Sequence, residues 1–464
     1  MTKKTLLVSG FAVAALVAVA QNRILVELTG QGGKGVIAIP EFRGSGDATR
    51  LMGTFNSTLW AEVEQSGLFR MAPRTSYPLQ APQQPQDIRG GQAPPPPAPP
   101  KRGAAPPTSA PTGMYLSDWA GPPVSANYLA FGYTAAQGGR LVLMGWFYNV
   151  NQPDAANAQV FGKIYNSTLD EAGARQVARD FAADILKQFG MSSLAGSKIV
   201  FVSNRTGTKE IWAMDYDGAN QRQITKYGSI STTPAVSPDG SKVAFTTYVR
   251  TQPEILIHSL ETSRRLPFFN QNASMNATPF FTPDGKQLVF SSTLAGGYAQ
   301  IYIADVNGSG LKRLTHSRFV EMEPKVNPKT GNEIVFVSGR SGPQQIYKMN
   351  IEGADIIRLT TGEGEASNPG WHPDGQHIAF SWTRGFEPGN FNVFVMNVAT
   401  REFVQLTHGA GRNENPTWGP DGRHIVFSSK RGGRTNIYTM LADGTQVKQL
   451  TTTGDNTMPV WSNK

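Results

Sequence analysis

Residues 369–380, PGWHPDGQHIAF, contain one copy of a repeated pattern from which the fold can be predicted. A short stretch containing Trp371 leads into Pro373-Asp374-Gly375, and Ile378-Ala379-Phe380 follows as a strand-like run. Asp-Gly at a turn supplies positive φ at low cost, so the segment predicts two short strands joined by a tight turn. We expect the apolar residue after the proline, here Trp371, to pack between neighbouring sheets.

The strands of this pattern recur six times within residues 196–464. The Pro-Asp-Gly turn stands at 238–240, 283–285, 373–375 and 420–422, and a longer turn replaces it at 327–331. Two sets of equivalent positions show the repeat most clearly. The strand aromatics are Phe201, Phe245, Phe290, Phe336, Phe380 and Phe427. The prolines are Pro234, Pro279, Pro324, Pro369, Pro416 and Pro459. A period near 45 residues with four short strands per unit is the signature of a β-propeller, so we predict six blades over residues 196–464.

The two ends of the repeat array predict how the ring closes. The first repeat opens at Ile199 with no proline strand before it, and the chain ends on such a strand, Met458–Ser462. We therefore expect the C-terminal strand to complete the first blade.

Residues 1–20 have the three-part pattern of a signal peptide. Lys3 and Lys4 precede an uncharged run that ends in Ala18-Val19-Ala20, a small-x-small cleavage site. The run is shorter than the roughly 20 residues of a membrane span, and a retained anchor is the competing interpretation. We predict cleavage near Gln21 and no membrane insertion afterwards.

Residues 21–195 predict a small α/β domain. Apolar residues every four positions indicate a helix over about 48–66, with Asp47 as its N-cap. A second helix is expected to begin at Thr168, which has capping-box spacing to Glu171.

A proline-rich insertion interrupts this domain at residues 78–113. It contains twelve prolines, including Pro94–Pro97. Proline at this density neither pairs in a sheet nor continues a helix, so we expect an exposed, disordered or polyproline-like segment. A tolerated surface insertion is favoured over a ligand for a proline-recognising domain.

Composition argues against several classes of site. The chain has no cysteine, and its net charge of +9 is scattered rather than clustered with aromatics, so no nucleic-acid partner is expected. Gly30, Gly32 and Gly35 match a dinucleotide fingerprint but precede a strand instead of a helix. The recurring Asp residues are explained by turn chemistry. We predict no catalytic, cofactor-binding or metal-binding residues, and no enzymatic activity.

Four further segments carry a family resemblance. They are Arg23–Glu27, Val36–Phe42, Glu64–Phe69 and Ile211–Asn220. Together with the signal peptide, the α/β domain and the six repeats, they resemble the TolB family of the Tol-Pal cell-envelope system. The resemblance covers the mature chain except residues 78–113.

The resemblance implies a monomeric, periplasmic, non-enzymatic adaptor that supports outer-membrane integrity and cell division. It implies that the N-terminal segment binds a TolA-type inner-membrane protein and that one propeller face binds a Pal-type lipoprotein. The implied TolA-binding residues are Asn22, Arg23, Ile24, Leu25, Val26 and Glu27. The implied Pal-binding residues lie just before the prolines of the repeats: Met275, Asn276, Thr278, Met322, Glu323, Ser367, Asn368, Glu414 and Asn415.

Two alternatives stay open from the residues alone. A secreted propeller could cleave a glycan or peptide, but the positions expected at the axis are mostly Thr, Ala, Asn and Ser, which is weak support for catalysis. A glycan- or peptide-binding module is the other alternative.

Overall fold

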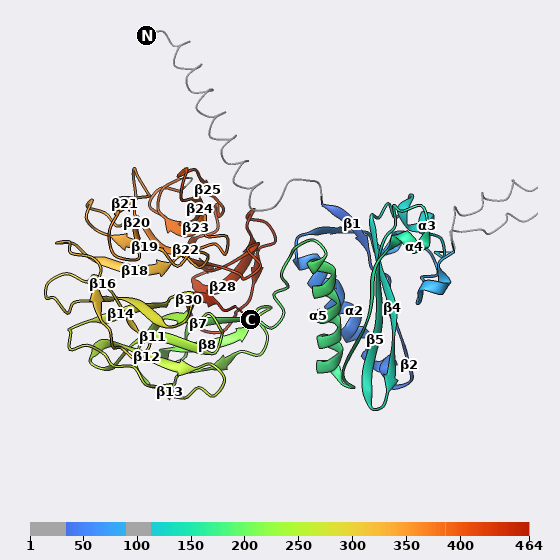
Figure 1. The fold of residues 1–464 in the computed structure, drawn as a ribbon, viewed down its shortest axis with the longest axis horizontal. Coiled ribbons are helices and arrows are strands. Elements are labelled where there is room, and N and C mark those ends of the chain that lie inside the picture. Colours follow the sequence, from blue (N-terminus) through green and yellow to red (C-terminus); the bar gives the residue numbers. More distant parts are fainter. Residues whose placement is uncertain (1–33, 90–112, 386, 464) are drawn as a thin grey trace, which may run out of the picture. The chain divides into compact units, whose positions relative to one another are not determined.

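The computed structural model describes residues 34–89, 113–385 and 387–463 (Figure 1). The chain divides into two compact units, one within residues 32–193 and the other from residue 194 onward. The predicted signal peptide lies outside the described residues.

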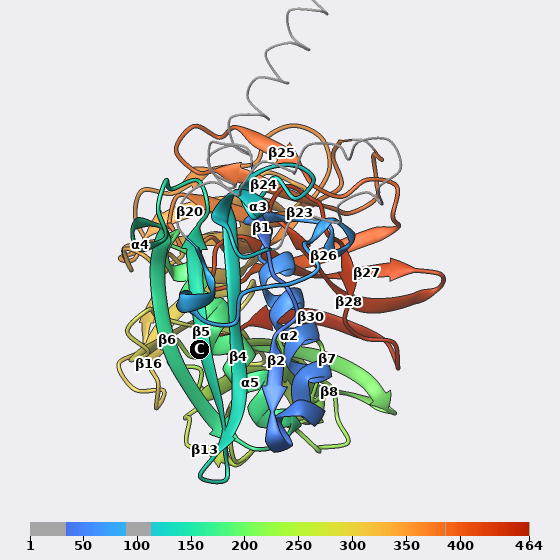
Figure 2. The ribbon, with the colours of Figure 1, turned by 90° about the vertical axis from the view of Figure 1, so that its right-hand side faces the viewer.

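The first unit is built on a six-stranded mixed sheet, in the order β3-β1-β4-β5-β6 with β2 also paired to β4. Its strands are β1 (Gly35–Ala38), β2 (Arg43–Ser45), β3 (Phe69–Met71), β4 (Tyr128–Gln137), β5 (Arg140–Asn149) and β6 (Gln159–Thr168). The β1–β3, β1–β4 and β2–β4 pairs are parallel, whereas β4–β5 and β5–β6 are antiparallel. Figure 2 shows β4, β5 and β6 side by side.

Two helices, α2 (Met52–Gln65) and α5 (Glu171–Lys187), cover one face of this sheet (Figure 1). Their apolar stripes form its main core, which includes the fully buried Phe55, Phe181 and Ile185. The remaining helical turns are η1 (Gly46–Leu51), η2 (Arg74–Ser76), η3 (Pro85–Asp87), α3 (Leu116–Ala120) and α4 (Ala155–Ala158).

Both predicted helix starts are wrong in detail. Asp170, not Thr168, caps α5, because its carboxylate accepts a hydrogen bond from the backbone N–H of Gly173 at 2.7 Å. Thr168 ends β6 and donates its hydroxyl to Asp170. Asp47 lies inside η1, and the α-helix begins only at Met52.

The start of the predicted disordered insertion is folded. Residues 85–87 form η3, Ile88 is buried, and Arg89 forms a bridge with Tyr115. Ile88 packs in the core on the second face of the sheet, whose largest member is Trp119. The expectation of disorder is therefore wrong for residues 78–89, and residues 90–112 lie outside the described part of the chain.

The second unit is the predicted six-bladed propeller, with four antiparallel strands in each blade. The first strands are β10 (Ser231–Val236), β14 (Asn276–Phe281), β18 (Glu321–Val326), β22 (Ala366–Trp371), β26 (Arg412–Trp418) and β30 (Asn456–Trp461). The second strands are β11 (Lys242–Arg250), β15 (Gln287–Ser292), β19 (Glu333–Ser338), β23 (His377–Trp382), β27 (His424–Arg431) and β7 (Lys198–Thr206). The third strands are β12 (Gln252–Ser259), β16 (Gln300–Asp305), β20 (Gln345–Asn350), β24 (Asn392–Asn397), β28 (Arg434–Leu441) and β8 (Thr208–Asp215). The short outer strands are β13 (Arg265–Leu266), β17 (Lys312–Arg313), β21 (Ile357–Arg358), β25 (Phe403–Gln405), β29 (Lys448–Gln449) and β9 (Arg222–Gln223).

The C-terminal strand closes the ring, as predicted. β30 pairs with β7 in the sheet β30-β7-β8-β9, with Trp461 opposite Ile199. The indole Nε1 of Trp461 donates to the Ser197 hydroxyl at 2.9 Å. The ring is thereby joined by residues more than 260 positions apart in sequence.

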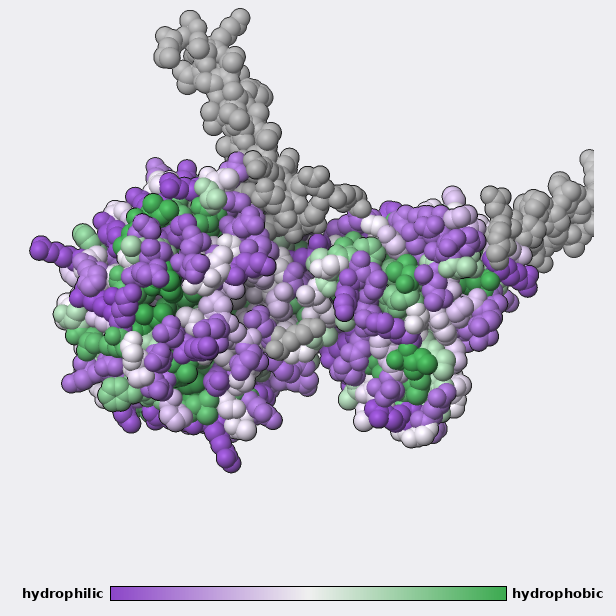
Figure 3. All heavy atoms as spheres, viewed as in Figure 1, coloured by the Kyte–Doolittle hydropathy of each residue, from purple (hydrophilic) through white to green (hydrophobic). Residues whose placement is uncertain are grey.

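The recurring aromatic side chains lie in the hydrophobic core of the propeller. None of the six strand phenylalanines is more than 2% exposed, and Trp371, Trp418 and Trp461 are buried. On the face shown in Figure 3, hydrophilic residues dominate the surface of each unit and hydrophobic residues form small separate groups. Scattered apolar residues of this kind are normal on a water-exposed surface.

Candidate binding surface at the propeller axis

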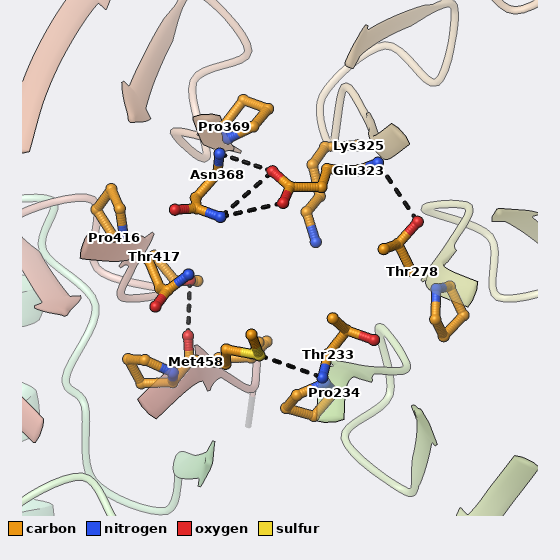
Figure 4. A pocket seen from close by; sticks show the side chains of 14 residues that line it. Thr233, Pro234, Thr278, Glu323, Lys325, Asn368, Pro369, Pro416, Thr417 and Met458 are labelled. Carbon is orange, nitrogen blue, oxygen red and sulfur yellow. Dashed lines mark hydrogen bonds between the residues drawn. The ribbon is translucent and has the colours of Figure 1, made fainter. Parts of the chain in front are cut away.

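The residue before each first-strand proline lies at one end of the propeller axis. These six residues are Thr233, Thr278, Glu323, Asn368, Asn415 and Met458, one from each blade. With five of the six prolines, and with Lys325, Thr417 and Val460, they line a pocket of about 80 Å³, which we call the pore-mouth pocket (Figure 4). In every blade the register between the first and second strands shifts at this point.

All six residues have left-handed backbone conformations, with φ between 46° and 56°. Positive φ is uncommon for residues other than glycine, and a following proline restricts the backbone further. Such conformations persist where the surrounding structure holds them, often at functional sites.

Hydrogen bonds between blades hold these conformations. The backbone N–H of Asn368 donates to the Glu323 carboxylate at 2.7 Å, and that of Glu323 donates to the Thr278 hydroxyl at 3.3 Å. The N–H of Thr233 lies 3.4 Å from the sulfur of Met458. Two further N–H groups of the ring donate to hydroxyls on second strands: Thr278 to Thr246, and Asn415 to Ser381. The left-handed turn therefore converts each of these amides into a link with the neighbouring blade.

Two ionisable residues, Glu323 and Lys325, line the pore-mouth pocket. The side-chain amide of Asn368 adds two contacts to the Glu323 carboxylate, at 3.2 and 3.3 Å. Burial raises the pKa of Glu323, although the hydrogen bonds from Asn368 oppose this shift. Burial lowers the pKa of Lys325 to about 8, against the attraction of Glu323. Both side chains are partly buried, so the charged form of each is less favourable here than in bulk water.

The structure brings together four of the nine residues expected to bind Pal. Thr278, Glu323, Asn368 and Asn415 line the pore-mouth pocket. The other five do not line it: Met275, Asn276, Met322, Ser367 and Glu414. Their part in binding, like that of the four, stays a prediction.

Two of the five predicted residues that do not line the pocket, Asn276 and Glu414, make other contacts. Asn276 is buried and donates to the backbone carbonyl of Gln271, so it supports a loop. Glu414 is partly exposed and pairs with Arg412 at 2.6 Å. The predicted TolA-binding segment, residues 22–27, lies outside the described residues.

Sequence reasoning missed five non-proline residues of this pocket, among them Thr417 and Val460, which follow their prolines. Thr233 and Met458 occupy the same register in the two remaining blades, so the proline spacing alone could have found them. Lys325 follows its proline, and only the folded ring shows that it reaches the axis (Figure 4).

His372, Asp374 and His377 form a group with potential metal ligands within 4.8 Å of one another. Hydrogen bonds within the turn already use these atoms. His372 Nδ1 accepts the backbone N–H of Asp374 at 3.0 Å, and its Nε2 donates to the carbonyl of Gly422 at 2.7 Å. His377 Nδ1 pairs with Asp374 at 2.8 Å. Turn formation accounts for this cluster without an ion.

The fold and the axial ring define a class: a six-bladed β-propeller, preceded in sequence by an α/β unit, with a ring of left-handed residues around a pocket at its pore. Comparison of the sequence with models of known protein families gives the family. The family model described as "TolB beta propeller domain" matches residues 186–385 and 362–464, so the chain belongs to the TolB family.

Individual relatives agree with this assignment. The chain is 35% identical over 218 residues to "Protein TolB homolog" of Chlorobium chlorochromatii (strain CaD3) and 33% identical over 229 residues to that of Chlorobium luteolum. These matches cover 47–49% of this chain and 47–50% of the relatives, so the chain spans about half the length of the curated relatives it matches. The crystal structure of TolB from Acinetobacter baumannii has the same fold, with a TM-score of 0.73 and 20% identity, over 93% of this chain and 98% of that one.

Among the described residues, none of the helices has the length and apolar character needed to cross a membrane.

Proposed function

We propose that this protein is a non-enzymatic periplasmic adaptor of the Tol-Pal system, binding a Pal-type lipoprotein at the pore-mouth pocket. The observation that carries the proposal is the ring of six left-handed residues, which gathers one side chain from every blade around the axis. A rigid scaffold that presents loop ends from several elements is a common form of binding surface.

The chemistry of the pocket favours binding over catalysis. Its volume of about 80 Å³ is small, and its lining is mostly Thr, Asn and Pro. Glu323 and Lys325 come from one strand, and the Glu323 carboxylate is occupied by Asn368. A general acid–base pair would need free carboxylate or imidazole groups within reach of a substrate.

Isothermal titration with the soluble domain of a Pal-type lipoprotein from the same organism tests this proposal. Glu414→Lys reverses a partly exposed charge one residue before the ring, so we expect at least tenfold weaker binding. The free energy of unfolding should change by no more than about 1 kcal/mol, because Glu414–Arg412 is a surface pair. Glu261→Lys is the matched control, since Glu261 is exposed in the loop between β12 and β13.

Failure of the wild-type protein to bind that domain would contradict the Pal assignment. A pull-down from envelope extract that recovers a glycan or an unrelated peptide instead would support the alternative of a secreted binding module. Equal affinity for Pal in the wild type and Glu414→Lys would move the interface away from this part of the mouth.

We further propose that residues 22–27 bind a TolA-type protein by adding a strand to its sheet. Ile24→Asp with Val26→Asp should abolish binding of the soluble TolA-type domain, since charges replace alternating apolar side chains, while Pal binding stays unchanged. Loss of both partners together would indicate a folding defect instead.

A further inference from the structure

A second cavity, of about 330 Å³, opens at the other end of the first strands. The turn between the first and second strands contributes a proline to its wall in five blades: Pro238, Pro283, Pro328, Pro373 and Pro420. We call it the turn-side cavity. Four residues line both this cavity and the pore-mouth pocket: Lys325, Pro369, Thr417 and Val460. Lys325 therefore stands between the two.

The ammonium group of Lys325, which is only partly buried, has no hydrogen-bond acceptor from the described part of the protein. Its Nζ lies 4.7 Å from the centre of the Phe280 ring, and it makes no hydrogen bond or ion pair within the described part of the chain. The neighbouring Glu323 carboxylate is held by Asn368 (Figure 4). An ammonium carries three donors, and a cation–π contact replaces water only in part.

A second donor in the wall is also unmatched. Trp418 is 4% exposed, and its indole N–H is buried without a partner. Its counterparts in two neighbouring blades are satisfied, because Trp371 donates to the carbonyl of Lys325 and Trp461 donates to Ser197. Buried polar groups without partners are few in native proteins, and each one calls for an explanation. At Trp418 an acceptor supplied by a bound molecule would provide one.

We propose that the turn-side cavity binds an apolar carboxylate, with the carboxylate group accepting from Lys325. Apart from Lys325, no ionisable group lines this cavity among the described residues. An anion entering from the opposite side would pass Glu323, which lines the pore-mouth pocket. The turn side is therefore the electrostatically open route.

The wall of the cavity selects the body of the ligand. Five prolines together with Trp371, Trp418 and Phe281 offer flat apolar surfaces. A volume of about 330 Å³ accommodates one aromatic ring or one large side chain. The ligand class is thus a small aromatic carboxylate or the C-terminal residue of a peptide, both of which carry the same group.

Titration of the full chain, followed by calorimetry and tryptophan fluorescence, tests this site. The probes are benzoate against benzamide, and N-acetylphenylalanine against its amide. Each neutral amide keeps the ring and removes the charge. We expect each carboxylate to bind at least tenfold more tightly than its amide in the wild type.

Substitution of the lysine tests the assigned residue. Lys325→Met should remove the preference for benzoate over benzamide, whereas Lys325→Arg should keep benzoate affinity within about threefold. Glu323→Gln, the control on the other side of Lys325, should leave benzoate binding unchanged or stronger. Binding of benzoate without N-acetylphenylalanine assigns the site to small molecules, and binding of both extends it to peptide C-termini.

Three results would overturn the proposal: no binding of either carboxylate, equal affinity for benzoate and benzamide, or unchanged benzoate affinity in Lys325→Met. The wild-type comparison of acid with amide decides the matter even if a variant fails to fold. None of these results depends on Pal binding, so the proposed function stands or falls separately.

Discussion

At the scale of single residues, the axis combines backbone strain with two partly buried ionisable side chains. The six residues before the prolines adopt a conformation that glycine would reach more easily, yet each carries a side chain. Five of the six amides bond to the adjacent blade, and so do the side chains of Thr278, Glu323, Asn368 and Met458. The strain is therefore balanced in part by side-chain contacts that a glycine ring would lack. Asn368 is the clearest case, because both its backbone and its side chain donate to Glu323.

Asn368→Ala should lower stability by about 1–3 kcal/mol, since the partly buried Glu323 carboxylate loses its side-chain donor and alanine tolerates positive φ poorly. Asn368→Gly loses the same side-chain donor, but glycine adopts positive φ without strain. We therefore expect a smaller loss of stability than in Asn368→Ala. Denaturant titration of both variants measures the difference. A glycine variant less stable than the alanine variant would show that backbone strain is unimportant at this position.

The partly buried Lys325 predicts an unusual dependence of stability on pH. The pKa of Lys325 falls to about 8 in the folded protein, from 10.5 in an unfolded chain. Below pH 8 both states are protonated and the wild type bears the full cost of the buried charge. Between pH 8 and 10.5 the folded lysine loses its proton first, so stability rises with pH. Above pH 10.5 the cost has vanished.

Lys325→Met removes this dependence and should melt higher than the wild type at pH 7. The difference in melting temperature should shrink as the pH rises from 8 to 10.5, and comparison of the two proteins cancels all other titrations. A constant difference across this range would mean that the ammonium is not desolvated.

At the scale of strands and helices, pattern predicted most of the architecture. The repeat spacing predicted the blades and the closing strand because each blade needs the same inward residues. The strand β4 escaped prediction, since Gly132 interrupts a run with weak alternation, and its Cβ position would meet the backbone of Met144. The folded ends of the proline-rich segment were missed because Ile88 is one apolar residue among prolines, and its partner Trp119 is distant in sequence. The residues of the axial ring were largely predictable from their position before the repeated prolines. The lack of a protein acceptor near Lys325 was not, because it depends on distances between blades.

Deleting residues 456–464 removes β30 and exposes the edge of β7. Burial of Trp461 alone is worth about 1.5–3 kcal/mol, and the lost ladder bonds add to it. We expect aggregation or a much lower melting temperature, measured by light scattering and calorimetry.

Deletion of residues 91–111 is the matched comparison for that truncation. It spares η3 and Ile88, so the melting temperature should change little. A monomeric C-terminal truncation with unchanged melting temperature would contradict closure by β30.

At the scale of the whole molecule, the first twenty residues predict export. Protein purified from its native source should begin at Gln21 or within a residue or two, because cleavage follows Ala18-Val19-Ala20. Intact mass spectrometry measures this directly. A mass that includes residues 1–20 would support the retained anchor instead.

The pairing of β30 with β7 also determines when the propeller of a newly made chain can close. A ribosome produces Lys198–Thr206 long before Asn456–Trp461, and a translocating chain would deliver them in the same order. Until the last segment emerges, the first blade lacks its innermost strand and the ring stays open. Contacts between distant segments form slowly, so this final step is expected to be late. A chain stalled before its final residues leaves β7 as a free edge, on which a chaperone or a second stalled chain can bind.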